Sequence, residues 1–343
     1  MSKLWKLLII SLSLGSCNNE IKIAAPWKET IVVYGLLDPA ASVNYIRIQK
    51  AFLDPDGNAF QFVQTGDSIY PGSLEVKIVV RKNGLTIDTL FPQLVDGELE
   101  GIKKDTGLFS NAPNYLYKIS DKIFDSRLIT GGKEDYEYEL QVKNKATGYQ
   151  CYAKTATTGL LESLYPVTPT SKDITIYDKA NSNVTVYYRE GRNVKTYDML
   201  IRFWYKEIQK SDTNVQTLKS FDWFILKNKP TKTIEGYETQ MTTVSGSIFY
   251  EILNAKIKPD VDIRREALYC DVEYYGAGED LYTFIQVNQP SLGIIQKKPE
   301  YSNVTNGLGI FSSRYITAIK KVPVSADMKI ALKNSNYTKN LNF

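Results

Sequence analysis

Apolar and polar residues alternate with a period of two in short stretches along most of this chain of 343 residues. Val76, Ile78 and Val80 fall on one face of such a stretch, and Lys77 falls on the other. Successive side chains of a β-strand point to opposite faces, so this alternation predicts strands. The pattern, with its β-branched and aromatic residues, predicts strands over residues 30–37, 43–53, 73–84, 85–91, 136–142, 149–155, 173–178, 183–190, 197–208, 220–227 and 267–276.

Sequence patterns typical of turns and helices lie between or after these predicted strands. Asn83-Gly84 lies between two predicted strands and predicts a tight hairpin, because both residues tolerate a positive φ. A helix is predicted over residues 278–289, and a weaker helical pattern covers residues 325–334. In the first helix the spacing i, i+3, i+4 and i+7 is occupied by Leu281, Phe284, Ile285 and Asn288.

The regular spacing of short strands predicts an all-β protein with one or two short helices. We expect an immunoglobulin-like β-sandwich over residues 28–160 and a second β-rich domain over residues 161–343. Pro166 and Pro169 mark the boundary between them. A chain of this length is also long enough for two domains, each with a core of its own.

The N-terminus has the order of an export signal. Two lysines precede an apolar run over residues 7–14, which is shorter than the ~20 residues that a membrane-spanning helix needs. The sequence LGSC at residues 14–17 resembles the bacterial lipoprotein box, in which the cysteine, here Cys17, is acylated by fatty acids such as palmitate. We therefore predict a signal peptide over 1–16 and a lipidated tether over 17–27; the alternative is an ordinary signal peptide with a chance cysteine.

Composition excludes several classes of function. The chain has no histidine, so it can form neither a Ser-His-Asp nor a Cys-His nucleophile system, nor a histidine-ligated metal site. Without residues 1–16, 40 basic and 38 acidic side chains remain, a net charge of about +2, which is too balanced for a nucleic-acid-binding protein. We nominate no catalytic residue, no metal ion and no cofactor, and predict a protein that is not an enzyme.

After Cys17, two cysteines remain, Cys151 and Cys270, each within a strand-like stretch. An exported protein can form a disulfide, so buried free thiols and a disulfide both remain open. The 24 tyrosines also allow two interpretations. They are typical of half-buried strand positions, and they also suit a binding surface.

Several stretches together carry a resemblance to a known family: the lipoprotein box, TIVVYGLLDP (30–39), the hairpin in YELQVKNKATGYQCYAKTAT (138–157), GEDLYTFIQVNQ (278–289) and YSNVTNGLGIFSSRY (301–315). They resemble the family of Bacteroidota outer-membrane lipoproteins of unknown function whose genes commonly neighbour TonB-dependent receptors. The resemblance carries over Asn303, Gly307, Gly309 and Phe311, which we interpret as a structural turn motif, with a ligand or partner contact as the alternative. It also implies a location at the outer membrane in the cell envelope.

Two short motifs suggest modification or metal binding. Asp67-Ser68-Ile69 and Asp88-Thr89-Leu90 resemble the O-glycosylation pattern of exported Bacteroidota proteins, which makes Ser68 and Thr89 predicted glycosylation sites. DPDGN at residues 54–58 resembles the start of a calcium loop, but its glycine lies in the fourth position rather than the sixth. We interpret that segment as a turn.

The sequence therefore predicts a non-enzymatic outer-membrane lipoprotein. It would act as an accessory or ligand-capturing subunit of a TonB-dependent transporter, with the β-barrel receptor as its partner and no nucleic acid bound. The alternative is a free-standing surface adhesin or a glycan- or peptide-binding lipoprotein. The resemblance favours the cell surface over the periplasmic face, but only narrowly, because surface-exported lipoproteins of this phylum usually have several acidic residues just after the cysteine and this chain has one, Glu20.

Overall fold

A computed structural model describes residues 29–51, 69–105, 107, 113–178, 182–289 and 300–343. It confirms the all-β class, because strands dominate these residues and the α-helices are short. Cys17, Ser68 and the 54–58 segment lie outside the described residues. Within them, no helix combines the length and the apolar character needed to cross a bilayer.

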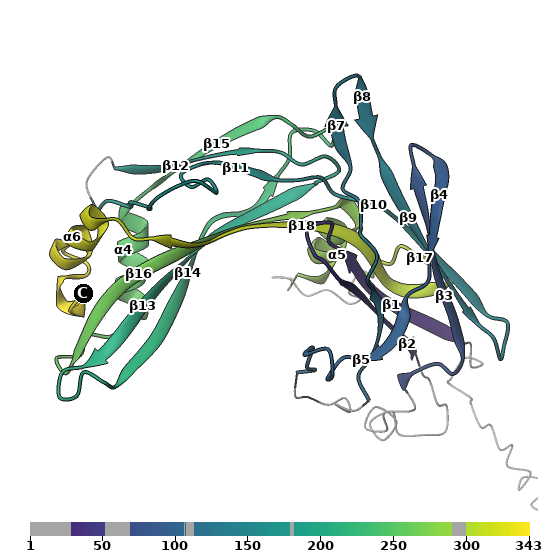
Figure 1. Cartoon of the computed structure of the whole chain (residues 1–343), viewed down its shortest axis with the longest axis horizontal. Coiled ribbons are helices and arrows are strands. Elements are labelled where there is room, and N and C mark those ends of the chain that lie inside the picture. The colour runs from purple at the N-terminus through teal and green to yellow at the C-terminus, as the bar shows by residue number, and fades with distance from the viewer. Residues whose placement is uncertain (1–28, 52–68, 106, 108–112, 179–181, 290–299) are drawn as a thin grey trace, which may run out of the picture.

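Two β-rich parts lie side by side, and one sheet extends through both (Figure 1). In spatial order, this eight-stranded sheet contains β14 (Gln216–Pro230), β13 (Thr196–Gln209), β16 (Ile263–Ala277), β18 (Gly307–Pro323), β1 (Thr30–Leu37), β2 (Asn44–Ala51), β6 (Tyr115–Ile119) and β5 (Gln93–Asp96).

The first part is a β-sandwich. The end of the large sheet that contains β1, β2 and β6 packs against a five-stranded sheet of β17 (Val304–Thr305), β10 (Gln150–Ala156), β9 (Tyr136–Asn144), β3 (Leu74–Lys82) and β4 (Leu85–Leu90). The alternating apolar residues of both sheets meet in one core, which includes Ile31, Val33, Ile46, Ile78, Tyr138, Leu140, Cys151 and Phe311. Outside these two sheets, β7 (Arg127–Ile129) and β8 (Gly132–Glu134) form a separate hairpin.

The second part has its own core beneath the long strands β13, β14 and β16. A three-stranded sheet of β11 (Glu162–Tyr165), β12 (Asn183–Arg189) and β15 (Thr239–Ser245) contributes to it, as do α4 (Ser247–Lys256) and α6 (Ala326–Asn334). A short 3-10 helix, η2 (Lys339–Leu341), lies near the end of the chain. Aromatic rings fill the centre of this core, including Phe203, Phe221, Trp223, Phe249 and Tyr250.

Strand β18, drawn in yellow, runs from the sandwich into the second part (Figure 1). It pairs in parallel with β1 through Gly307 to Ser313, and antiparallel with β16 through Arg314 to Pro323. Phe311 of β18 consequently belongs to the core of the sandwich, as does Val304 of β17, which pairs with β10, although both residues follow most of the second part in sequence. The boundary at residue 160 remains a prediction, and the C-terminal segment contributes to both parts.

Most of the predicted elements are confirmed. Asn83 and Gly84 have φ values of 48° and 82°, as the predicted hairpin requires. The predicted helices at 278–289 and 325–334 correspond to α5 (Glu279–Asn288) and to α6. The strand predicted over residues 173–178 is wrong, because this extended segment makes only a single bridge, from Ile174 to Val324. Helix α4 was not predicted.

Both cysteines are buried and unpaired. Cys151 lies in the core of the sandwich and Cys270 in the core of the second part, which decides between the alternatives that the sequence left open. Burial raises the pKa of the Cys151 thiol to about 12 and raises the pKa of Cys270 as well. Since the thiolate is the nucleophile, neither cysteine is a reactive site.

A tightly packed junction joins the two parts. Arg192, which is only 3% exposed, donates hydrogen bonds to Asp135 of the sandwich and to Glu235 of the second part. The N–H of Gly159 donates to the carbonyl of Arg192 at 2.7 Å. A Cβ on Gly159 would lie 2.3 Å from the carbonyl oxygen of Ser126, so this backbone approach requires glycine.

Candidate functional site

The four residues carried over by the resemblance, Asn303, Gly307, Gly309 and Phe311, hold β18 against β1. The Asn303 amide donates to the carbonyl of Phe311 at 2.7 Å and accepts from its N–H at 3.0 Å. Gly309 has a φ of +101°, and a Cβ there would lie 2.0 Å from the carbonyl oxygen of Val33. A Cβ on Gly307 would lie 2.8 Å from the Ile31 carbonyl oxygen. Only glycine permits this close strand pairing.

Each of the four motif residues therefore has a role in the fold. Asn303 precedes β17, whereas Gly307, Gly309 and Phe311 lie within β18, so most of the motif forms a strand rather than a turn. The Phe311 side chain is fully buried in the sandwich core. These contacts explain why a sequence that pairs with β1 in this way contains asparagine, two glycines and an aromatic residue.

Thr89 lies on β4, at the edge of the five-stranded sheet, and is half-buried. Its N–H donates to the Asp88 carboxylate at 2.7 Å. The predicted glycosylation of Thr89 stays a prediction, as do the acylation of Cys17 and the glycosylation of Ser68.

A cluster of charged and aromatic side chains covers the face of the large sheet opposite the second core. In β13 the residues Ile201 and Phe203 face that core, so by alternation Arg202 and Trp204 face away from it. We call this group the sheet-face cluster. It consists of Arg202, Trp204, Asp222, Tyr269, Asp271, Glu273, Tyr275 and Lys320, from strands β13, β14, β16 and β18.

Arg202 anchors one side of the sheet-face cluster. Its Nε and Nη2 atoms donate to the two carboxylate oxygens of Asp222 at 2.7 and 2.9 Å. This two-point pairing fixes the planar guanidinium and raises the pKa of Arg202. In return, the hydrogen bonds from Arg202 hold the pKa of Asp222 below its usual range. The pair is therefore charged at neutral pH and rigid.

Asp271 and Glu273 form a carboxylate pair on one face of β16, and they are 7% and 4% exposed. Lys320 forms ion pairs with both of them. The Trp204 Nε1 atom donates to Asp271 at 3.0 Å, and the Tyr275 hydroxyl donates to Glu273. Burial alone would raise the pKa of Glu273, but the hydrogen bonds from Lys320 and Tyr275 outweigh burial and lower it.

This cluster is suited to binding rather than to proton transfer. A general acid at neutral pH needs a raised pKa, whereas Glu273 is held ionised. Arginine, tyrosine and tryptophan on one face are typical of protein contact surfaces. A hollow of about 490 Å³ is lined by Arg202, Trp204 and Asp222 of the cluster and also by residues of the second core, including Phe221 and Ile257, so it lies beside the cluster rather than within it.

The lowered pKa of Glu273 predicts a pH dependence of stability. Its contribution is fully present above the unfolded-state pKa near 4.5 and is lost as the pH falls toward the lower folded-state pKa. We expect Glu273→Gln to flatten the decline of the urea midpoint between about pH 6 and about pH 3. Urea titrations of the wild type and the variant at both pH values measure this. A decline as steep in the variant as in the wild type would contradict the assigned role.

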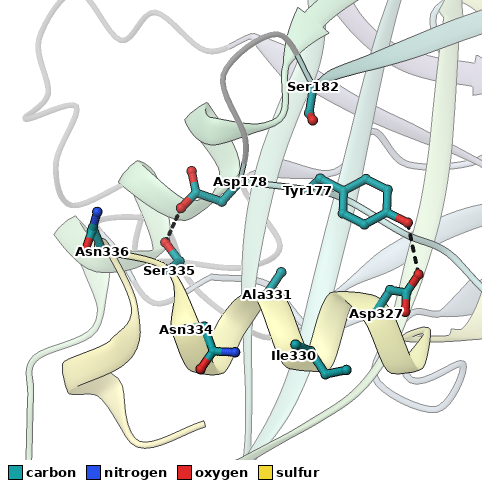
Figure 2. Close-up of a pocket in the computed structure, with 9 residues that line it drawn as sticks. All are labelled: Tyr177, Asp178, Ser182, Asp327, Ile330, Ala331, Asn334, Ser335 and Asn336. Carbon is teal, nitrogen blue, oxygen red and sulfur yellow. Dashed lines mark hydrogen bonds between the residues drawn. The ribbon is translucent and has the colours of Figure 1, made fainter.

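A second candidate site is a pocket of about 630 Å³ between helix α6 and the segment that precedes β12 (Figure 2). We call it the helix pocket. Its lining combines polar and apolar surface and consists of Tyr177, Asp178, Ser182, Asp327, Ile330, Ala331, Asn334, Ser335 and Asn336.

Both carboxylates of the helix pocket already accept a hydrogen bond from a hydroxyl group (Figure 2). Tyr177 donates to Asp327 at 3.1 Å, and Ser335 donates to Asp178. The bond to Asp327 raises the pKa of Tyr177, so this residue remains a hydrogen-bond donor rather than a base. The pocket offers carboxylate acceptors and amide donors to a polar ligand, and its described lining includes no cysteine or lysine nucleophile.

No protein-family model matches this chain, and no curated protein matches it significantly.

Neither of the two sites was predicted from the sequence. The alternating polar face of the strands at 197–208 and 267–276 could have indicated Arg202, Asp271 and Glu273, but their proximity to Lys320 depends on the pairing of β16 with β18. Groups of three or more acidic or cysteine side chains arranged to hold a metal ion are not found in the part of the chain that the structure describes.

Proposed function

We propose that this protein is a lipid-anchored, non-enzymatic binding protein of the bacterial outer membrane. In this proposal it is an accessory or ligand-capturing subunit of a TonB-dependent transporter. Cys17 provides the anchor, because multiple acyl chains hold a protein to a bilayer far better than one. The mature β-rich body provides the contact surface outside the membrane.

The observation that carries the proposal is the sheet-face cluster. Its ion pairs are already made within the protein, so the surface is ordered before a partner arrives, which lowers the entropic cost of binding. Trp204 and Tyr269 lie with ring centroids 6.0 Å apart and present aromatic area beside these charges. Rigid aromatic anchors surrounded by fixed charges favour a specific protein contact.

Copurification tests this function. We expect the tagged full-length protein, extracted from its native outer membrane with a mild detergent, to retain a TonB-dependent barrel in stoichiometric amount. Trp204→Ala should reduce the recovered barrel at least tenfold, since central aromatic residues contribute about 2 kcal/mol or more to such interfaces. Mass spectrometry identifies and quantifies the partner.

Leu218→Ala is the matched control, because Leu218 is 50% exposed on the edge strand β14 and lies outside the cluster. It should retain the barrel at the wild-type level. Recovery of the wild-type protein in the membrane fraction without any β-barrel would refute the transporter proposal.

The second candidate function is that of a free-standing surface protein that binds glycans or peptides. The helix pocket favours it, because amide, hydroxyl and carboxylate groups on facing walls match the hydroxyl groups of a sugar. This function predicts binding on a glycan array without a transporter. An array without any binding would count against it.

A further inference from the structure

A third pocket lies at the edge of the sandwich, between β5 and β6 of one sheet and the start of β3 in the other. We call it the edge pocket. Its volume of about 610 Å³ is within the range of small-molecule sites, about 300–1,000 Å³. Its lining combines aromatic, aliphatic and a few polar residues: Ile48, Tyr70, Pro71, Gly72, Ser73, Leu74, Glu75, Val76, Pro92, Leu94, Tyr115 and Tyr117.

The apolar wall of the edge pocket is a continuation of the sandwich core. Ile46 of β2 pairs with Tyr117 of β6, and Tyr117 pairs with Leu94 of β5, so these three side chains lie in one row on the same face. Ile46 is fully buried and Tyr117 is 9% exposed, but Leu94 is 56% exposed. Core-facing apolar surface therefore becomes accessible at this edge of the sheet.

Two further aromatic rings line the edge pocket. Tyr70 and Tyr115 pack edge to face with their centroids 5.0 Å apart, at an angle of 66°. The Lys104 ammonium group lies 5.4 Å from the centre of the Tyr70 ring and also donates to the Pro113 carbonyl at 2.9 Å. These contacts hold the Tyr70 ring in place without involving its hydroxyl group.

The Tyr70 hydroxyl is buried, and it has no hydrogen-bond partner among the described residues. Tyr70 as a whole is 9% exposed. Leaving a buried hydroxyl without a partner is unfavourable, so buried tyrosines usually have one. Because this hydroxyl has almost no accessible surface, a ligand in the edge pocket must displace the side chains that cover it; an oxygen atom brought to the hydroxyl would then remove the penalty.

We propose that the edge pocket binds a neutral sugar ring, which would be the ligand captured by this protein. The C–H face of a sugar packs on tyrosine rings, and its hydroxyl groups need nearby polar partners. Tyr70, Ser73 and Glu75 supply such partners beside the aromatic wall. An entirely apolar ligand would leave the Tyr70 hydroxyl unpaired, and an anionic one would meet the Glu75 carboxylate.

This inference rests on the ligand-capturing half of the proposed function. The test is saturation-transfer NMR on the full-length acylated protein, in micelles of a detergent without a sugar head group. The probes are glucose, galactose, mannose and N-acetylglucosamine. We expect saturation transfer to at least one of them, and a roughly tenfold lower affinity in Tyr70→Phe, the loss that corresponds to one hydrogen bond to a buried group.

The matched control for Tyr70→Phe is Tyr188→Phe. Tyr188 is also fully buried with an unpartnered hydroxyl, but it lies in the core of the second part. Tyr188→Phe should bind the sugar like the wild type. Without sugar, Tyr70→Phe should keep or raise the wild-type melting temperature, because it removes an unpaired buried hydroxyl and no hydrogen bond made among the described residues.

Leu94→Arg places a long side chain at the exposed rim of the edge pocket and should abolish the saturation transfer. The equivalent change at Leu99, which is 89% exposed outside the pocket lining, should not. No saturation transfer to any of the four sugars, or transfer that both pocket variants leave unchanged, would overturn the inference. Copurification of the barrel is measured separately. Sugar binding without copurification of the barrel would refute only the transporter proposal, and copurification without sugar binding would refute only the edge-pocket proposal.

Discussion

Gly309→Ala should destabilise the sandwich by about 2–6 kcal/mol, or prevent it from folding. The expected loss has two parts. A non-glycine residue at a φ of +101° costs about 1–3 kcal/mol in backbone strain. The added Cβ would lie 2.0 Å from the Val33 carbonyl oxygen, and overpacking of this kind costs about 1–3 kcal/mol more. Urea unfolding followed by tyrosine and tryptophan fluorescence measures the change.

Gly84→Ala separates these two contributions. Gly84 also has a positive φ, of +82°, but a Cβ there would have no heavy atom within 4 Å apart from those of the residues adjacent to it in the chain. We therefore expect Gly84→Ala to cost only the conformational term, about 1–2 kcal/mol. Equal losses for the two glycines would show that the close approach of β18 to β1 adds nothing, and would contradict the role assigned to Gly309.

Local sequence signals were sufficient for much of the sandwich. Val76, Ile78 and Val80 alternate in the sequence and are 6%, 0% and 2% exposed in the structure, because the period of a strand is a property of neighbouring residues. The Asn83-Gly84 turn was identified for the same reason. Helix α5 was also predicted from its spacing, although none of its described residues is fully buried.

Strand β18 could not be recognised locally. Its first half, GLGIFSS, contains two glycines and two serines, a composition that favours turns over strands. It becomes a strand because β1 and β16, distant in sequence, pair with its two halves. The reverse error occurred at residues 173–178, where Ile174 and Ile176 alternate but no neighbouring strand pairs with them beyond one bridge.

The candidate sites depend on the same long-range pairing. Arg202, Glu273 and Lys320 lie on three different strands, and only the registers of β13 with β16 and of β16 with β18 bring them together. The edge pocket likewise joins residues from four strands and the segment that precedes β3. A binding surface was one of the two interpretations that the sequence allowed for the tyrosines. It contained no information on which of them share a face.

The junction at Arg192 provides the second large expected effect. Arg192 donates to both carboxylate oxygens of Asp135 from one side of its guanidinium, and to Glu235 from the other. These hydrogen bonds raise the pKa of Arg192, so the cation persists at any physiological pH. It connects the turn that precedes β9 in the sandwich with the loop between β14 and β15.

We expect Arg192→Met to destabilise the protein by about 2 kcal/mol. Removing one partner of a fully buried ion pair costs about 3–5 kcal/mol, but Asp135 and Glu235 are 33% and 56% exposed and regain contact with water. Methionine retains most of the apolar stem of arginine, so the decrease in the free energy of unfolding measures the contribution of the guanidinium group. Arg189→Met is the matched control, because the Arg189–Glu162 pair is exposed and should contribute less than about 1 kcal/mol.

Calorimetry distinguishes a role in joining the two parts from a role within one of them. Each part has its own core, and β18 and the junction connect them. The wild-type protein should therefore unfold in one cooperative transition, and Arg192→Met should separate it into two, because the coupling is weakened while both cores remain intact. A single transition with an unchanged midpoint in Arg192→Met would show that β18 alone couples the parts. Separated transitions would instead indicate that Arg192 helps to fix the orientation of the sheet-face cluster relative to the edge pocket.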